Sequence, residues 1–437
     1  MTEREKRVQW FMKSRFGLFL HWGLYAIHGY GEWMMSEKNM SAKEYEERYF
    51  SQFNPVDFNP ELWAQKAKEA GMEYAVLTAK HHDGFCLFDS KYTDYKVTNT
   101  PFKRDIVKEY VDAFRKAGIK VGLYYSLLDW HHPDYPKYDD MYHPMRGNEK
   151  YKDEKVNFDN YLDYMHNQVK ELVTNYGKID ILWFDFSYDG KRNEDWRATE
   201  LIKMVRTYQK DVLIDNRLET SGEGFGSIIT KEPAFFSGDF ASPEQIIPGE
   251  GIVNELGNPV PWELCTTMNN NWGYNMNDSL YKPSWLLIRK LVECVSKGGN
   301  VILNVGPDAK GNFNAQSLSI LKDFATWMDK NSASIKGCGN AYLPKPDWGR
   351  YTKNGNHLYA HVFEPPIGPL ALPGIKSEDI VSMHYLENGV AVEKGDSWIT
   401  KAYEGVAFAS LGPIPHFSYP LLNEIDTVVD IELRNKK

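Results

Sequence analysis

Short apolar runs alternate with amphipathic stretches along the first three quarters of the chain. Eight of these runs are continuously apolar, as in parallel strands that are covered on both faces. They span residues 15–23, 73–84, 120–126, 178–185, 211–217, 235–240, 262–270 and 300–307. Helices with a terminal glycine are expected between them at 61–71, 104–118 and 284–299. Eight such alternations predict a (β/α)8-like TIM barrel, whose helical pattern is weakest around 211–240.

The pattern changes after about residue 340, where strand-like segments follow one another without helices. They cover residues 357–365, 380–389, 389–395, 405–412 and 427–434, with turn residues between them. We therefore predict two domains: a catalytic (β/α)8-like barrel over 1–340 and a C-terminal antiparallel β-sandwich domain over 341–437.

Polar side chains gather where the predicted barrel strands end. Chemistry in such barrels is located at the C-terminal ends of the strands. Five histidines lie at or just beyond these ends: His21, His81, His82, His131 and His132. A lone histidine is usually a satisfied core residue, but five at one rim favour a functional site.

Metal binding is the first alternative for these histidines. The chain has no HxH strand motif, no HExxH helix and no closely spaced acidic cluster. His81 and His82 are adjacent, and adjacent residues on a strand point to opposite faces, so both cannot easily ligate one ion. The structural alternative for the pair is one inward ring and one ring packed against a neighbouring loop. The pattern favours a site without a metal.

Carboxylates provide the stronger hypothesis. Asp185 ends the apolar run ILWFD and is expected at the barrel mouth beside Trp183. Glu244 in ASPEQ and Glu263 in PWELC are the candidates for a second carboxyl group. Two carboxyl groups with imidazoles and aromatic rings are typical of glycosidic bond cleavage. A catalytically inactive sugar-binding barrel is the alternative from another class.

Several motifs resemble those of the α-L-fucosidases of glycoside hydrolase family 29. The resemblance extends in order through the barrel, in FGLFLHWG (16–23), GEW (31–33), AKHHDGFCLFDSKYTDY (79–95), GLYYS (122–126), DILWFD (180–185), SPEQ (242–245), WELC and WGYN (262–275), and GGNVILNVGPDAKG (298–311). It implies an exo-acting retaining α-L-fucosidase, which hydrolyses terminal α-L-fucosyl residues of oligosaccharides or glycoconjugates by double displacement. A glycosidase acting on another sugar is the nearest alternative.

The resemblance also implies roles for individual residues. Asp185 corresponds to the nucleophile, Glu244 to the general acid/base, and Glu263 is the rival for the second role. Phe186 stands where many relatives have glycine. The sugar-binding set comprises His21, Glu32, Trp33, His81, His82, Tyr124, Trp183, Arg217, Glu263 and Trp272. No metal or organic cofactor is implied.

Composition limits the partners. The balance of 51 Lys and Arg against 60 Asp and Glu gives a formal net charge of -9, which argues against nucleic acid or an anionic membrane as the partner.

Four cysteines without CxxC spacing, and an N-terminus without an apolar signal-type core, predict a cytoplasmic protein. Trp398 lies near a Gly-Asp turn, from which it could reach a neighbouring subunit of a homo-oligomer or the active-site rim, and core packing is the alternative. Aromatic residues make up 14% of the chain and include 13 tryptophans; those at strand ends, Trp22, Trp33, Trp130, Trp183 and Trp272, favour sugar contacts.

Overall fold

Seven parallel strands form a curled sheet in the computed structural model, which describes residues 2–434. The strands are β1 (Phe16–Leu20), β2 (Tyr74–Lys80), β3 (Lys120–Ser126), β4 (Ile181–Asp185), β5 (Leu213–Ile214), β6 (Glu263–Thr267) and β7 (Asn300–Val305). Their order is β5-β4-β3-β2-β1-β7-β6. Seven of the eight predicted strands are thus confirmed, and the predicted TIM-like barrel is the observed architecture.

The sixth predicted strand, 235–240, is not a regular strand. Isolated parallel bridges join Asp215 to Phe240 and Ala241 to Trp262, so this segment links the edge strands β5 and β6 through single contacts. Gly238 explains the irregularity: its φ is +81°, and an added Cβ would lie 2.1 Å from the carbonyl oxygen of Asp215. The close approach of the two backbones leaves no room for a side chain there.

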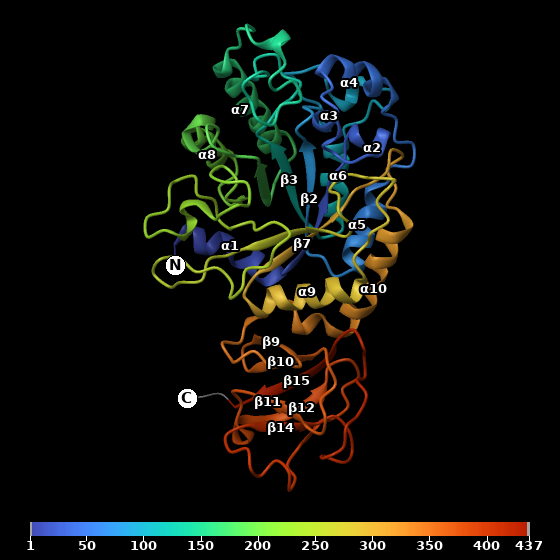
Figure 1. Cartoon of the computed structure of the whole chain (residues 1–437), viewed down its shortest axis with the longest axis vertical. Coiled ribbons are helices and arrows are strands. Elements are labelled where there is room, and N and C mark those ends of the chain that lie inside the picture. Colours follow the sequence, from blue (N-terminus) through green and yellow to red (C-terminus); the bar gives the residue numbers. More distant parts are fainter. Residues whose placement is uncertain (1, 435–437) are drawn as a thin grey trace.

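Helices surround the sheet (Figure 1). They are α1 (Glu3–Ser14), α2 (Tyr25–His28), α3 (Met34–Glu37), α4 (Ala42–Tyr49), α5 (Pro60–Glu69), α6 (Ile106–Lys116), α7 (Phe158–Asn175), α8 (Ala198–Tyr208), α9 (Ser284–Ser296) and α10 (Ala315–Asn331). The three predicted helices are confirmed as α5, α6 and α9. Side-chain caps explain two of their starts: Asn59 accepts a hydrogen bond from the backbone of α5, and Asp105 does the same for α6. Among the described residues, only a short 3-10 turn (Gly226–Ile229) follows β5, as the weak pattern there indicated.

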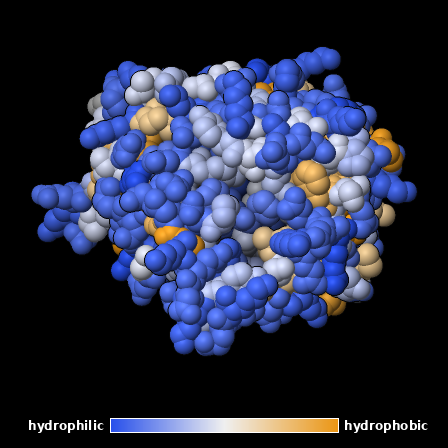
Figure 2. Space-filling view, turned by 90° about the horizontal axis from the view of Figure 1, so that it is seen from above, coloured by the Kyte–Doolittle hydropathy of each residue, from blue (hydrophilic) through white to orange (hydrophobic). Residues whose placement is uncertain are grey.

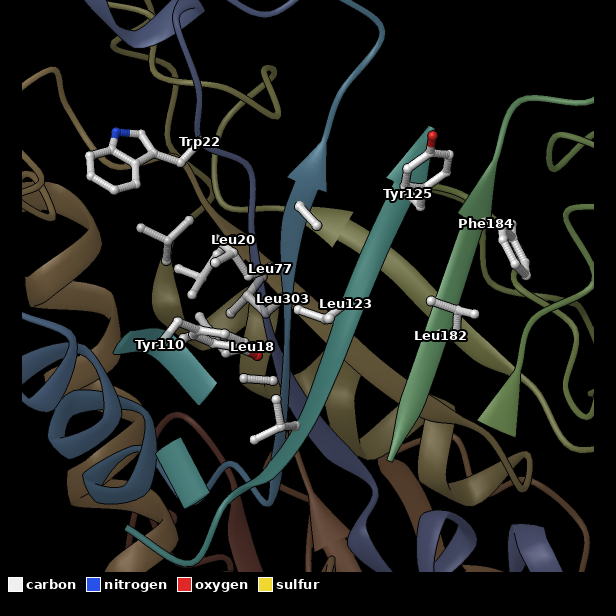
Figure 3. Packing of buried hydrophobic residues seen from close by; sticks show 14 of the residues in the cluster. Leu18, Leu20, Trp22, Leu77, Tyr110, Leu123, Tyr125, Leu182, Phe184 and Leu303 are labelled. Atoms are coloured by element: carbon white, nitrogen blue, oxygen red, sulfur yellow. The ribbon is translucent and has the colours of Figure 1, made fainter. Parts of the chain in front are cut away.

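Strand alternation divides the buried residues into two clusters. Leu123 and Leu182 belong, with Tyr110 of α6, to the cluster between sheet and helices (Figure 3). Tyr124 and Trp183 belong to a separate cluster inside the barrel. Because successive side chains on a strand alternate, a polar residue two positions beyond an interior residue also faces the interior. This alternation therefore determines which strand-end side chains can reach a site inside the barrel.

The C-terminal part consists of two antiparallel sheets. One has the order β12-β15-β10-β9-β8 and the other β11-β14-β13. The strands are β8 (Gly339–Asn340), β9 (Gly349–Asn354), β10 (His357–Val362), β11 (Leu370–Leu372), β12 (Ile380–Tyr385), β13 (Glu393–Lys394), β14 (Ala407–Ser410) and β15 (Thr427–Leu433). Buried residues of both sheets, such as Leu358, Ile431 and Leu372, share one core. The predicted β-sandwich is therefore confirmed.

The sandwich packs against the side of the barrel formed by α9 and α10, whereas β2 and β3 point away from it (Figure 1). Arg289 of α9 fastens the two parts, since its guanidinium donates to the carbonyl oxygens of Phe363, Glu424 and Ile425. Trp398 is 75% exposed, so the alternative that it packs in the core is wrong.

Candidate active site

A pocket opens where the parallel strands end, and it holds about 420 Å³ of space counted out to its open mouth. Figure 2 views this end of the molecule, where mostly hydrophilic residues surround paler ones near the centre. Asp185 ends β4 on the interior side, two positions after Trp183, and His21 likewise follows Phe19. The lining residues are Phe19, His21, Glu32, Trp33, His81, His82, Tyr124, Trp183, Asp185, Phe186, Arg217, Ser221, Glu244, Cys265 and Trp272. Every predicted site residue except Glu263 is among them.

Asp185 lies between two hydrogen-bond donors. Its Oδ1 accepts from Nη1 of Arg217 at 3.1 Å, and its Oδ2 accepts from the hydroxyl of Tyr124 at 2.7 Å. Burial raises the pKa of Asp185 to about 6, while Arg217, Tyr124 and the N–H of Phe186 act against that rise. The carboxyl group is therefore ionised at neutral pH, as a nucleophile must be.

Arg217 connects the two candidate carboxylates. Its Nη2 donates to Oε2 of Glu244 at 3.0 Å, while Nη1 holds Asp185. The remaining donor positions bind Ser242 and the carbonyl oxygen of Ser221. The side chain of Arg217 is 2% exposed and that of Glu244 is 35% exposed, so Glu244 reaches solvent while the guanidinium does not. Burial lowers the pKa of Arg217, but the two carboxylates outweigh that effect and raise it.

His21 is held as one neutral tautomer. Nδ2 of Asn304 donates to the carbonyl oxygen of Trp272 at 2.6 Å, so the Asn304 side-chain oxygen faces Nδ1 of His21, 2.6 Å away. The Nδ1 atom therefore carries the proton, and Nε2 keeps a free lone pair. Burial lowers the pKa of His21 to about 3, which keeps the ring neutral.

His82 is oriented in the same way. The hydroxyl of Ser126 donates to the carbonyl oxygen of Leu128, so Nδ1 of His82, 2.6 Å from that hydroxyl, is the donor. Both His81 and His82 line the pocket, so the alternative in which one of them packs against a neighbouring loop is wrong. The β2–β3 register shifts after Thr78 and β2 ends at Lys80, so the pair lies beyond the strand and is free of its alternation. Burial lowers the pKa of both rings, which are neutral.

The rest of the pocket combines an acid with aromatic rings. Glu32 accepts a hydrogen bond from the backbone N–H of Gly273 at 2.7 Å, and burial raises the pKa of Glu32 to about 7. Phe19 and Trp272 form an apolar side whose ring centroids are 5.9 Å apart. Trp33 is half-buried at the mouth. Such a pocket can bind hydroxyl groups on one side and an apolar substituent on the other.

Glu263 lies outside the pocket. It starts β6 inside the barrel, where the hydroxyl of Tyr74 donates to it. Burial raises its pKa to about 8, against the hydrogen bond from Tyr74 and the influence of the nearby Trp183 indole. Its side chain is therefore neutral at pH 7 and supports Trp183 from below the pocket.

Some residues that the pattern favoured for the site do not line the pocket. Trp22 and Trp130 are fully buried and do not line the pocket. His131 stacks on Tyr95, with ring centroids 3.9 Å apart, and His132 packs against α7. Trp22 and Trp130 lie in the layer between sheet and helices, whereas His131 and His132 are half-buried outside the pocket.

Sequence reasoning missed the residues that orient the site. Asn304, Ser126 and Ser242 fix His21, His82 and Arg217 respectively. Their one available signal was a polar side chain at a strand end. Among residues 2–434, no group of three or more His, Cys, Asp or Glu side chains is arranged to hold a metal ion. Within the same residues no helix is long and apolar enough to cross a membrane.

Two carboxylates joined by a buried arginine, with neutral imidazoles and aromatic rings at the mouth of a parallel-stranded barrel, define a glycoside hydrolase site. The profile of the α-L-fucosidase family matches residues 1–333. The chain is 52% identical to α-L-fucosidase isoenzyme 1 from Paenibacillus thiaminolyticus, with a TM-score of 0.95 over 99% of this chain and 100% of that one. A GH29 α-L-fucosidase from Bacteroides thetaiotaomicron, trapped as a covalent intermediate, is 30% identical with a TM-score of 0.82, covering 98% of this chain and 96% of that one. The plasma α-L-fucosidase of Homo sapiens is 28% identical over 75% of this chain and 68% of its own length.

The chain therefore belongs to the α-L-fucosidase family, and it is a glycoside hydrolase with α-L-fucosidase activity. The predicted family is confirmed.

Replacing Tyr124 by Phe tests the hydrogen bond to Asp185. Loss of a donor to the carboxylate raises the pKa of Asp185 further, by up to about one unit. We expect the acidic limb of the kcat/KM profile to move to higher pH by that amount. Tyr125→Phe is the matched control, since the Tyr125 hydroxyl binds Gln168 on the opposite face of β3. If the acidic limb of the kcat/KM profile stays at the wild-type pH in Tyr124→Phe, as it should in Tyr125→Phe, the result would contradict the hydrogen bond between Tyr124 and Asp185.

Glu263→Gln tests the neutral state of the buried carboxyl group. Because the folded-state pKa of about 8 exceeds the usual 4.5, the unfolded state binds fewer protons between these values, so wild-type stability falls as pH rises through this window. Gln has no proton to lose. The variant should gain stability over wild type from pH 4.5 to 8, reaching roughly a few kcal/mol, and keep kcat within about threefold.

Urea unfolding at several pH values measures the Glu263→Gln effect. The exposed Glu250→Gln variant is the control and should follow the wild-type curve. Parallel curves for wild type and Glu263→Gln, or a loss of activity of about 100-fold or more, would show an ionised or catalytic Glu263.

Proposed function

We propose that this enzyme is an exo-acting retaining α-L-fucosidase, with Asp185 as nucleophile and Glu244 as general acid/base. The shared guanidinium of Arg217 is the observation that carries the proposal. One side chain contacts both carboxylates, at 3.1 Å and 3.0 Å, which keeps the two groups close together. Retaining glycosidases need closely spaced carboxyl groups, because no water has to fit between the nucleophile and the sugar.

The combined charge of Asp185 and Glu244 stays constant through both steps of the reaction. In the first step ionised Asp185 attacks the anomeric carbon, the glycosidic C–O bond breaks, and protonated Glu244 gives its proton to the leaving oxygen. Asp185 is then an ester and Glu244 an anion, so the pair still carries one negative charge. Arg217 neutralises that charge in either location. In the second step Glu244 takes a proton from water, which attacks the anomeric carbon and releases L-fucose and the Asp185 carboxylate.

Neutral donors and acceptors suit a neutral sugar. The free lone pairs on Nε2 of His21 and His82 can accept from hydroxyl groups, and the indole N–H of Trp33 can donate to one. Phe19 and Trp272 offer an apolar side for the methyl group that distinguishes a 6-deoxy sugar. Each group would be left unpaired by a sugar lacking the matching hydroxyl, which favours selectivity for fucosylated glycans. The trapped covalent intermediate of the Bacteroides thetaiotaomicron relative supports the covalent route.

Azide rescue distinguishes the two carboxylates. Glu244→Ala should lower kcat for an unactivated fucoside by about 10²–10⁴-fold. With an activated aryl α-L-fucoside, added azide should restore turnover and give the α-fucosyl azide, because azide attacks the covalent intermediate from the face that the aglycone left. Asp185→Ala should instead give the β-azide, because azide there replaces the nucleophile.

NMR of the azide products provides the measurement, with wild-type enzyme and azide as reference. Rescue in Glu263→Ala rather than Glu244→Ala would move the acid/base role to Glu263. An initial release of β-L-fucose by the wild type would exclude retention and the covalent route with it.

A further inference from the structure

Phe186 adopts a backbone conformation that bulky residues avoid. It directly follows Asp185, and its φ is +82°. Side chains with a Cβ are rarely found in this region, and such conformations persist where the surroundings hold them, often at functional sites. The N–H of Phe186 lies close enough to the Asp185 carboxyl to lower the pKa of that group. A glycine would provide the same N–H without strain, so the benzyl group needs a separate explanation.

The ring of Phe186 lies at the half-exposed mouth of the pocket. Its centroid is 5.3 Å from that of Trp33 and 4.9 Å from that of His82. Tyr142 meets the same ring edge-on, with centroids 4.8 Å apart and planes at 83°. We call Trp33, Phe186 and Tyr142 the aromatic wall. Tyr142 is half-buried and is not a lining residue of the pocket.

A buried charged cluster holds the outer part of the wall. Asp140 accepts hydrogen bonds from the backbone N–H of Tyr142 at 2.9 Å and from the hydroxyl of Tyr188. Lys191 pairs with Asp140 at 2.8 Å. Tyr188 in turn packs against Tyr142, with ring centroids 4.8 Å apart. The loops after β3 and β4 are thereby tied together, so the wall is a rigid surface.

The position of the wall indicates what it contacts. The deep part of the pocket is formed by buried side chains such as His21, Tyr124 and Trp183, which the proposed function assigns to the fucose ring. Whatever is attached to that sugar must leave through the half-exposed mouth, beside Glu244. Rigid aromatic rings present a flat apolar surface, against which the C–H face of a second sugar or an aryl group packs.

We infer that Phe186 is a specificity-determining residue whose ring, at the inner end of the aromatic wall, contacts the leaving group of the substrate. This inference rests on the proposed function. It assigns the ring of Phe186 to the aglycone and the deep pocket to fucose, while Trp33 lies between the two and keeps its indole N–H for a fucose hydroxyl.

Three substrates with different leaving groups test the inference: α-L-fucosyl fluoride, 4-nitrophenyl α-L-fucoside and a fucosylated disaccharide. Fluoride is too small to reach the wall. Phe186→Gly removes the ring and suits the positive φ. It should lower kcat/KM about 10-fold for the aryl fucoside and the disaccharide, with fluoride hydrolysis within twofold of wild type. The inhibition constant of L-fucose, which occupies the deep pocket alone, should not change.

Phe186→Leu is a second variant in case Phe186→Gly fails to fold, since leucine keeps the bulk but not the flat ring. We expect the same selective loss of kcat/KM for the aryl fucoside and the disaccharide. Phe235→Gly removes an exposed ring outside the pocket and should leave all values unchanged. An equal loss with all three substrates, together with weaker inhibition by L-fucose, would overturn the inference and assign Phe186 to the fucose site. Failure of wild-type enzyme to hydrolyse fucosyl fluoride would instead contradict the proposed function.

Discussion

The buried guanidinium of Arg217 is the interaction on which the site depends. Asp185 is almost enclosed at the mouth of an apolar barrel, and burial alone would keep its carboxyl group protonated. Arg217 opposes that effect and contacts Glu244 with its other amino group. The charge of the arginine is itself tolerable because Ser221 and Ser242 satisfy its remaining donors. A buried cation with complete hydrogen bonding can stabilise an anion at either carboxylate.

The imidazole rings around Arg217, Asp185 and Glu244 are uncharged, so they do not offset the charges of these three groups. Burial keeps the rings of His21, His81 and His82 neutral and raises the pKa of Glu32 and Glu263. The imidazole rings therefore add no charge to that of Arg217 and the two carboxylates. The same neutral groups are suited to hydroxyl groups, so one physical condition, the exclusion of water, serves both catalysis and sugar binding.

The prediction from sequence succeeded where a single strand determined the outcome. Asp185 ends a run whose alternation is readable, and its interior direction follows from Trp183 two residues earlier. Prediction failed where contacts with a neighbouring backbone segment changed the local conformation. The bridge at Phe240 replaces a strand because Gly238 lies against the carbonyl of Asp215, and strand alternation does not apply to His81 and His82 because β2 ends before them. Such features arise from contacts between segments far apart in sequence.

The amino-acid sequence by itself determined the architecture, the family and most of the pocket residues, because strand and helix periods and strand-end polar groups are local properties. The tertiary structure decided how those residues act together. It joined Asp185 and Glu244 through Arg217, withdrew Glu263 into the barrel, and selected one tautomer each for His21 and His82. It also placed Phe186 in a strained conformation at the pocket mouth. Each of these depends on burial and on hydrogen bonds between distant segments, and neither can be read from a local pattern.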